Sequence, residues 1–237
     1  GLTSSNLGTP DYDLASEQHK AYRKALEKCG TRVITLPPDP RFPDSVFVED
    51  TALLIEEAAI LARPGAVTRR GEVDGIRQIL SEHFPVIEEI KAPGTLEPGD
   101  VLEVEDHYYI GLSKRTNHEG AQQLISKLEK YGKSATTIKL REYLHLKTGV
   151  AYLGNDTLLV AGELKNSPHF QQYECIEVNE NEEYAANSIR VNDYVITPSG
   201  FPGTSDTLTS SGFKLIQVDT SEFRKLDGGV SCMSLRF

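Results

Sequence analysis

The chain has 237 residues, enough to bury a substantial core as one large domain or two small ones. Its hydrophobic content of 38% and charged content of 25% are ordinary for a globular protein, and no apolar stretch approaches the ~20 residues of a membrane span. The net charge of −10, without any basic run, argues against a nucleic-acid-binding surface.

The N-terminal part of the chain is predicted to be a loop, a helix and a short strand. Residues 1–13 are rich in Gly, Ser, Thr and Asp, which favours a loop. Apolar residues at helical spacing predict a helix over 14–29 that stops at Gly30. A strand is expected over 32–36, and the proline-rich loop after it leads to Asp44.

From residue 46 onward the same order of elements recurs four times, as strand, strand, helix and strand. Repeats of roughly 35–50 residues are typical of a ring or array of modules. We therefore expect an α/β fold of repeated ββαβ units around a common axis. The predicted strands are 46–55, 58–62, 86–90, 101–104, 108–112, 135–140, 145–153, 157–161, 175–178, 186–191, 193–197 and 214–218, and the predicted helices are 73–83, 119–131, 168–173 and 206–211.

The three cysteines do not form a recognisable framework. Cys29, Cys175 and Cys232 are widely spaced, so they predict neither a disulfide scaffold nor a CxxC metal site. A reducing cytoplasm is the simplest setting for them.

Chemically active residues occur where the first strand of each module begins, at the end that would face the axis. Taken in chain order they are Asp44, Glu49 and Asp50, then Glu97 and Asp100, then His145, Asn187 and Cys232. A cysteine, a histidine and a carboxylate are the set used in thiol-based acyl or amidino transfer. Each residue alone has a plainer interpretation: Cys232 as a small buried residue, His145 as a core histidine on a strand, and Glu97 as part of a polar turn.

The adjacent pair Glu49 and Asp50 lies within a stretch that is otherwise apolar. If this stretch is a strand, at least one of the two carboxylates faces inward. A buried carboxylate needs a cationic partner, which can be a guanidinium ligand or an arginine of the fold. Arg69 and Arg115 occupy equivalent loops in successive modules, where they could bind a ligand carboxylate or simply be solvated. A ligand with a guanidinium group at one end and a carboxylate at the other, such as arginine or a derivative, would match both the acids and the arginines. We expect no metal ion.

Several segments together resemble the dimethylarginine dimethylaminohydrolase family. This family belongs to the guanidino-group modifying superfamily, whose pentein fold is a five-module β/α propeller. The resemblance runs in order along nearly the whole chain. The segments are 43–50 (PDSVFVED), 62–70 (ARPGAVTRR), 96–102 (LEPGDVL), 111–117 (GLSKRTN), 144–147 (LHLK) and the stretch around Cys232.

The resemblance implies hydrolysis of Nω-methylated arginine to citrulline and methylamine or dimethylamine, without a cofactor. The rivals are an arginine deiminase acting on unmethylated arginine, an amidinotransferase, and a non-catalytic module that binds arginine derivatives. The implied partner is a small-molecule substrate, with neither nucleic acid nor membrane, and the implied state is a monomer or homodimer. The implied roles are Cys232 as nucleophile, His145 as general acid and base, Glu97 as its orienting partner, Glu49 and Asp50 as guanidinium anchors, Arg69 and Arg115 as carboxylate clamp, and Asp44 with the backbone around Leu226 and Asp227 near the α-amino group.

The module that contains Cys232 is expected to be split between the two ends of the chain. Its first strand would be 230–237, and its helix and last strand would be 14–29 and 32–36. No segment is left for its second strand. We therefore expect residues 1–237 to be a single catalytic pentein domain that lacks an N-terminal strand.

Overall fold

The structure is a computed structural model that describes residues 2–237. Its residues form two compact units, which are described separately. Unit 1 contains the residues up to Pro37 together with Thr148–Ser231, and unit 2 contains Pro38–Lys147 together with Cys232–Phe237. No helix in the described part of the chain is both long and apolar enough to cross a membrane.

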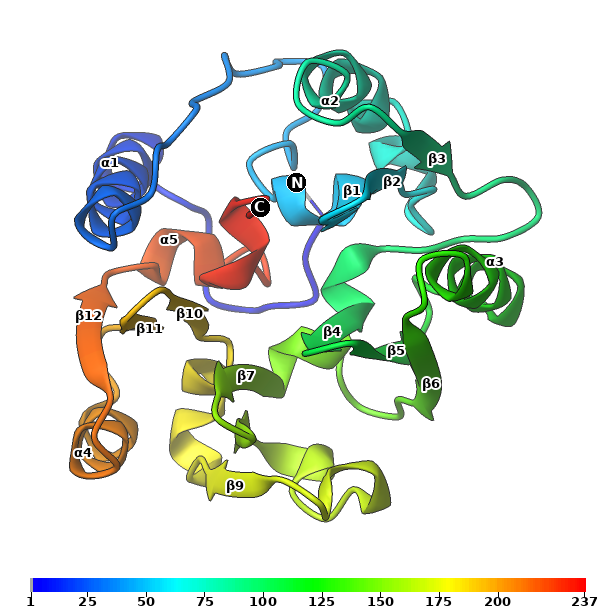
Figure 1. Cartoon of the computed structure of the whole chain (residues 1–237). Helices are drawn as coiled ribbons and strands as arrows, with labels where there is room; N and C mark the ends of the chain where they lie inside the picture. The colour runs from blue at the N-terminus through cyan, green and yellow to red at the C-terminus, as the bar shows by residue number, and fades with distance from the viewer. Residues whose placement is uncertain (1) are drawn as a thin grey trace. The chain divides into compact units, whose positions relative to one another are not determined.

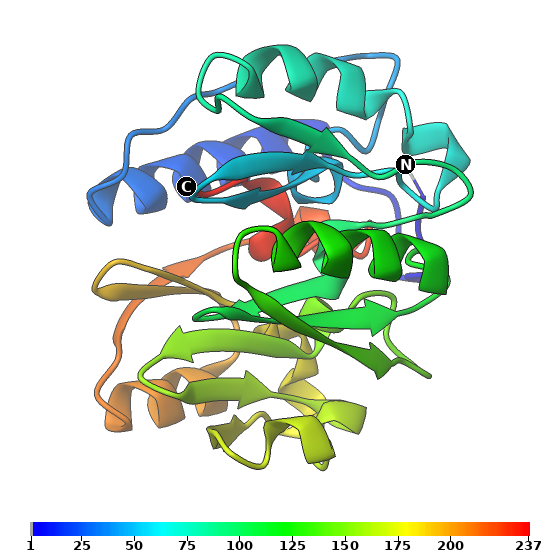
Figure 2. The ribbon, with the colours of Figure 1, turned by 45° about the vertical axis from the view of Figure 1, so that its right-hand side comes forward.

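Unit 2 contains two three-stranded sheets, each with one α-helix in its connection. In the second of them, α3 lies beside β5 and β6, as Figures 1 and 2 show. The elements of the first are a 3-10 turn Val48–Thr51, β1 Ala52–Ile55, β2 Ala58–Leu61, α2 Glu72–Leu80 and β3 Ile87–Glu89; those of the second are a 3-10 turn Pro98–Asp100, β4 Val101–Val104, β5 His107–Leu112, α3 His118–Glu129 and β6 Ser134–Lys139.

Unit 1 contains two further sheets of the same kind and the N-terminal helix α1, Tyr12–Lys28. The side chain of Asp11 caps α1, and the chain leaves the helix at Gly30 with φ of 88°, a left-handed conformation that glycine adopts without steric cost. The other elements are β7 Val150–Gly154, β8 Thr157–Val160, β9 Glu174–Glu177, β10 Ile189–Val191, β11 Tyr194–Pro198, α4 Pro202–Ser210, β12 Lys214–Val218 and α5 Ser221–Arg224.

All four sheets share one topology. The first strand pairs antiparallel with the second, and the third pairs parallel with the second, which is therefore central. Tight hairpins join the antiparallel strands, and in three of them Glu105, Asn155, Asp156 and Asn192 take the positive φ angles that are typical of two-residue hairpin loops. The predicted ββαβ repeat is confirmed in each sheet. In the third, short 3-10 turns replace the helix.

Each unit has its own apolar core. In unit 2, residues of the first two sheets and of α3 pack together, with Ile60, Leu96, Ile110 and Leu124 fully buried. In unit 1, the equivalent core is formed by residues of the third and fourth sheets and of α4. Both cores come from the alternating and helical apolar patterns that predicted the elements.

Five predicted strands are wrong in whole or in part, namely 32–36, 46–55, 145–153, 186–191, which begins only at Ile189, and 230–237. Residues 46–51 form turns because Arg69 binds the carbonyl groups of Asp44 and Phe47. The strand predicted over 145–153 begins only at Val150, because the Leu146 N–H donates to the Asp100 carboxylate instead of a neighbouring strand.

The segments 230–237 and 32–36 belong to no sheet in the described chain. The first contains a 3-10 turn, Ser231–Met233. The Val230 carbonyl accepts a hydrogen bond from Tyr22, and the Ser231 N–H donates to Asn187. Side chains therefore satisfy the backbone where a strand was expected.

Candidate active site

Glu49 and Asp50 lie on the 3-10 turn that precedes β1, and both carboxylates are buried. Glu49 Oε1 lies 2.7 Å from Lys147 Nζ and 3.6 Å from an Arg236 side-chain nitrogen. Asp50 Oδ2 lies 2.5 Å from Arg69 Nη1, while Oδ1 accepts a hydrogen bond of 3.1 Å from the Gly99 N–H. The turn thus buries both acids, where a strand would have buried one.

Arg69 is buried with its guanidinium enclosed by acceptors. Besides Asp50, it binds both oxygens of the buried Glu72 and the carbonyls of Asp44 and Phe47. Burial lowers the pKa of Arg69, but the charges of Asp50 and Glu72 outweigh it and raise the pKa. Burial also raises the pKa of Glu72, against the opposing effect of Arg69. Arg69 is therefore a charged link between two carboxylates.

Glu97, at the start of the second module, joins the predicted histidine. The Glu97 side chain is fully buried, and its Oε2 lies 2.7 Å from His145 Nε2. Its Oε1 accepts a hydrogen bond from the Ala66 N–H and lies 3.3 Å from Arg115 Nη1. The Arg115 side chain is 20% exposed, so this guanidinium can reach solvent or a ligand. The structure thus brings together Glu97, His145 and Arg115.

His145 carries a proton at neutral pH because of the acids around it. Burial lowers its pKa, but the charge of Asp50, the hydrogen bond with Glu97 and the charge of Asp100 together raise the pKa to about 9. Asp50 Oδ1 lies 4.0 Å from His145 Nε2. Burial raises the pKa of Asp50, but His145 and Arg69 outweigh it and hold that pKa below its usual range.

Cys232 lies on the 3-10 turn Ser231–Met233 and is partly buried. The segment that it begins, Cys232–Phe237, belongs to unit 2 with Glu97 and His145. This segment is held by the ion pair of Arg236 with Glu49 and by ring contacts of Phe237. The pKa of each of the other two thiols, Cys29 and Cys175, is raised by burial, which makes them poor nucleophiles.

The remaining predicted residues fall in both units. Asp44 is buried in unit 2 beside Arg69. Leu226 and Asp227 lie in unit 1, after α5, where Asp227 takes a φ of 60°. The Asp227 carboxylate accepts hydrogen bonds from Ser4 and Thr3.

Sequence reasoning missed three charged partners of the predicted site residues. Glu72 binds Arg69, and both Lys147 and Arg236 pair with Glu49. The spacing of three residues between Arg69 and Glu72 is a signal that could have predicted that pair. No local signal connects Glu49 with residues 98 and 187 positions away along the chain.

Ligand atoms of Asp50, Glu97 and His145 all lie within 4.8 Å of one another, a spacing that could hold a metal ion. The charges favour a different use, because a histidine with a pKa of about 9 is an imidazolium at neutral pH and has no lone pair facing the acids. The cluster is better suited to hold a cation such as guanidinium beside a proton donor.

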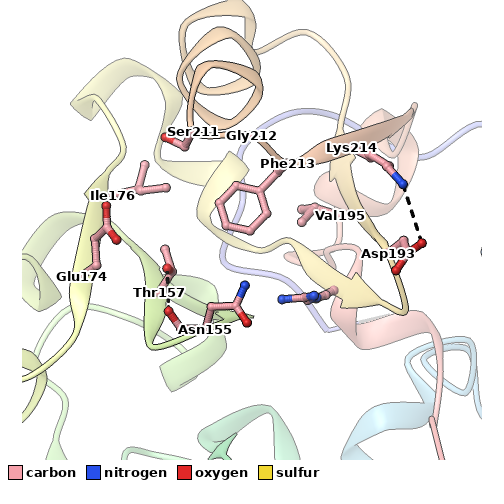
Figure 3. A pocket seen from close by; sticks show the side chains of 11 residues that line it. Asn155, Thr157, Glu174, Ile176, Asp193, Val195, Ser211, Gly212, Phe213 and Lys214 are labelled. Atoms are coloured by element: carbon pink, nitrogen blue, oxygen red, sulfur yellow. Dashed lines mark hydrogen bonds and ion pairs between the residues drawn. The ribbon is translucent and has the colours of Figure 1, made fainter.

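A cavity of about 420 Å³ lies in unit 1, away from these residues in the sequence (Figure 3). Its charged lining is Glu174, Arg190, Asp193 and Lys214, all exposed, and Lys214 pairs with Asp193. Two acids and two bases in contact with solvent select neither an anionic nor a cationic ligand. The buried acidic cluster of unit 2 is therefore the candidate active site.

Comparison with known proteins finds relatives over nearly the whole chain. The arginine deiminase family model matches residues 11–195. The chain is 55% identical to N(G),N(G)-dimethylarginine dimethylaminohydrolase of Pseudomonas aeruginosa, over 100% of this chain and 94% of that protein. It is 33% identical to the protein of the same name from Streptomyces coelicolor, over 95% and 87% of the two chains.

The structural comparison extends over the same length. DDAH from Pseudomonas aeruginosa, solved as a cysteine-to-serine variant complexed with citrulline, matches with a TM-score of 0.99 and 54% identity, over 100% of this chain and 93% of that one. This match confirms the predicted pentein fold of repeated β/α modules. The chain therefore belongs to the dimethylarginine dimethylaminohydrolase family, within the wider group that the arginine deiminase model describes.

Proposed function

We propose that the protein is a dimethylargininase, which hydrolyses asymmetric dimethylarginine or monomethylarginine to citrulline and dimethylamine or methylamine. The observation that carries the proposal is the buried cluster in which His145 Nε2 lies 2.7 Å from Glu97 Oε2 and 4.0 Å from Asp50 Oδ1, an arrangement that raises the pKa of His145 to about 9. A buried proton donor next to an anion suits a cationic substrate that must lose an amine. The family relationship supports methylated arginine as that substrate.

The first chemical step is attack of Cys232 on the guanidinium carbon. The thiolate sulfur forms a bond to that carbon and gives a tetrahedral adduct. The bond to the alkylated nitrogen then breaks, and His145 gives its proton to the departing amine. A thiouronium remains attached to Cys232, and His145 is left neutral.

The second step is hydrolysis of the thiouronium. Neutral His145 accepts a proton from water, whose oxygen bonds to the same carbon. The carbon–sulfur bond then breaks to give the ureido group of citrulline and restore the thiol. Over both steps one water is consumed and one alkylamine is released, and the reaction needs no cofactor.

The charge on His145 favours substrate-assisted formation of the thiolate. An unperturbed cysteine, with a pKa of ~8.5, is mostly a neutral thiol at pH 7. Since His145 is already protonated in the free enzyme, it cannot serve there as the base for Cys232. The bound guanidinium cation lowers the thiol pKa instead, so that the thiol proton is lost to solvent before the attack. A standing Cys232–His145 ion pair is the competing route.

The family relationship supports the binding roles, in which Asp50 and Glu49 anchor the guanidinium and Asp44 receives the α-amino group. Arg115 and Arg69 remain the proposed clamp for the carboxylate. Arg115, which is partly exposed, can turn toward a ligand by releasing Glu97 alone, whereas the buried Arg69 would have to release Asp50 or Glu72.

The chain is proposed to act as one catalytic domain in the cytoplasm. Three free cysteines and a net charge of −10 suit a reducing, aqueous compartment. The proposed partner is the small-molecule substrate, with the protein as a monomer or homodimer.

The test is citrulline release from asymmetric dimethylarginine and from unmodified arginine, measured side by side. A dimethylargininase releases citrulline and dimethylamine from the first and far less citrulline from the second. The reverse preference would identify an arginine deiminase, which the family model's description makes the second candidate. Binding of both amino acids without any citrulline would indicate a non-catalytic binding module.

A further inference from the structure

Asp100 is a buried carboxylate that the steps above do not use. It ends the 3-10 turn Pro98–Asp100, three residues after Glu97, and its side chain is inaccessible to solvent. Burial raises its pKa to about 6 against the opposing effect of the His145 charge and of its hydrogen-bond donors. At neutral pH it is therefore an ion that can only accept hydrogen bonds. The position of Asp100 and its hydrogen-bond donors indicate its role.

One oxygen of Asp100 fixes the backbone beside the catalytic histidine. Asp100 Oδ1 accepts a hydrogen bond of 3.0 Å from the Leu146 N–H. Leu146 follows His145 directly and begins the 3-10 turn Leu146–Thr148. The carboxylate thus holds the chain at the point from which the imidazole extends toward Glu97.

The other oxygen fixes the loop that carries Arg115. Asp100 Oδ2 accepts a hydrogen bond of 2.7 Å from the Ser113 hydroxyl. The same hydroxyl oxygen accepts hydrogen bonds from the Arg115 N–H at 2.9 Å and the Thr116 N–H at 3.2 Å. Thr116 also hydrogen-bonds to Asp100, and its hydroxyl accepts from the Glu97 N–H. The Asp100 side chain therefore contacts, directly or through one hydroxyl, the segments that carry His145, Arg115 and Glu97.

We propose that Asp100 is a positioning residue for methylarginine hydrolysis, holding His145 through Leu146 and Arg115 through Ser113. This inference rests on the proposed function. It predicts two separable effects. Loss of the hydrogen bond to Leu146, the Leu146 arm, should lower turnover. Loss of the hydrogen bond to Ser113, the Ser113 arm, should weaken binding of the substrate carboxylate. A buried acid that served stability alone would not separate them.

Three substitutions distinguish the arms. Asp100→Leu removes both, so kcat for asymmetric dimethylarginine should fall by about 10²-fold, the cost of a misplaced catalytic group, and KM should rise. Ser113→Ala removes only the Ser113 arm, so KM should rise while kcat stays near the wild-type value.

Asp100→Asn should behave like Ser113→Ala. Its amide oxygen still accepts from Leu146, but its NH₂ group faces a Ser113 oxygen that already accepts two hydrogen bonds.

The matched control is Glu182→Leu in unit 1. Glu182 is also buried and accepts three hydrogen bonds, from the Gly203 and Thr204 N–H groups and the Thr204 hydroxyl at the start of α4. Its loss should lower thermal stability and leave kcat and KM unchanged.

The inference is overturned if Asp100→Leu keeps the wild-type kcat, if Glu182→Leu loses as much kcat, or if Ser113→Ala lowers kcat without raising KM. Should Asp100→Leu fail to fold, Ser113→Ala and Asp100→Asn decide, because a rise in KM at constant kcat in both supports the inference and its absence in either contradicts it.

A wild-type protein that releases no citrulline overturns the proposed function, and this inference with it. A wild-type protein that is active while these variants show no such pattern overturns this inference alone.

Discussion

Among single residues, Gly99 is the glycine that lies between His145 and Asp50. A Cβ placed on it would lie 2.8 Å from His145 Nδ1 and 2.9 Å from Asp50 Oδ1, and its own N–H donates to Asp50. The absence of a side chain lets the acid and the imidazolium come close against bare backbone. The close approach of Asp50 and His145, and hence the raised pKa of the histidine, depends on this glycine.

Gly99→Ala should therefore lower kcat strongly, since either His145 or Asp50 must move. The control is Gly75→Ala in α2, where an added Cβ meets nothing within 4 Å. That change should leave kcat unaffected and stabilise the protein by roughly 0.5–1 kcal/mol, the usual gain of alanine over glycine inside a helix. Steady-state kinetics and thermal unfolding of both variants check the prediction, which fails if the two substitutions affect kcat equally.

The protonation of His145 predicts how activity depends on pH. With a pKa raised from 6.5 to about 9, the imidazole keeps its proton through neutral pH and loses it as the pH rises through about 9. Since only the protonated form can give a proton to the departing amine, kcat/KM should fall above about pH 9. The pH profile for asymmetric dimethylarginine measures this, and His145→Ala should lack that descending limb. A wild-type profile that falls instead with an apparent pKa near 6.5, the unperturbed value, would be inconsistent with the charged cluster.

The roles of single residues could be predicted only in part. Glu97 and His145 were paired in advance because cysteine, histidine and carboxylate form a known set and their motifs occur in order. The links from Asp50 to Arg69 and from Arg69 to Glu72 were not predicted, because they depend on how a loop folds back on a turn. Local patterns carry no information about such contacts.

At the scale of elements, the start of the turn that carries Cys232 is held by one amide side chain. Asn187 is buried, its oxygen accepts from the Ser231 N–H at 2.9 Å, and its NH₂ group donates to the Ser231 hydroxyl at 3.0 Å. Gly229 has no Cβ where Asn187 packs against it. The chain therefore enters the turn Ser231–Met233 in a fixed conformation immediately before the proposed nucleophile.

Asn187→Leu should loosen this turn and lower stability by roughly 1–3 kcal/mol, because it leaves a buried N–H without an acceptor. Turnover should fall as well, since Cys232 is the next residue. Asn187→Asp keeps an acceptor for the N–H, and the Ser231 hydroxyl can donate to it, so it should retain more activity than the leucine variant. Chemical unfolding and kcat of both variants test this, and equal kcat values in the wild type and Asn187→Leu would show that the turn needs no such support.

Regular elements were predicted far better than turns. β4 and β12 begin and end at the predicted residues, because short apolar runs between polar turns define a strand locally. The predicted strand over 230–237 and the first part of the one over 46–55 were wrong because backbone groups there are bound by Tyr22, Asn187 and Arg69. An apolar run predicts burial, but only the partner of each N–H and carbonyl decides between strand and turn.

At the scale of the whole molecule, the repeated order of elements was the decisive signal. Four modules with one topology follow from four stretches with the same order of elements, because the three strands of each sheet all come from one module. The division into two compact units was not predictable in this way. Unit 2 combines Pro38–Lys147 with the distant C-terminal segment Cys232–Phe237, and no local pattern indicates which unit that segment joins.

The central claim is that one thiol, Cys232, performs covalent catalysis on methylated arginine. The most direct measurement is citrulline release from asymmetric dimethylarginine by the wild type and by Cys232→Ser, with Cys175→Ser as the matched control for loss of a partly buried thiol. We expect Cys175→Ser to match the wild type, and Cys232→Ser to fold and bind substrate but release no citrulline, because a hydroxyl is far less acidic than a thiol. Citrulline release by Cys232→Ser at a tenth of the wild-type rate or more would contradict the account.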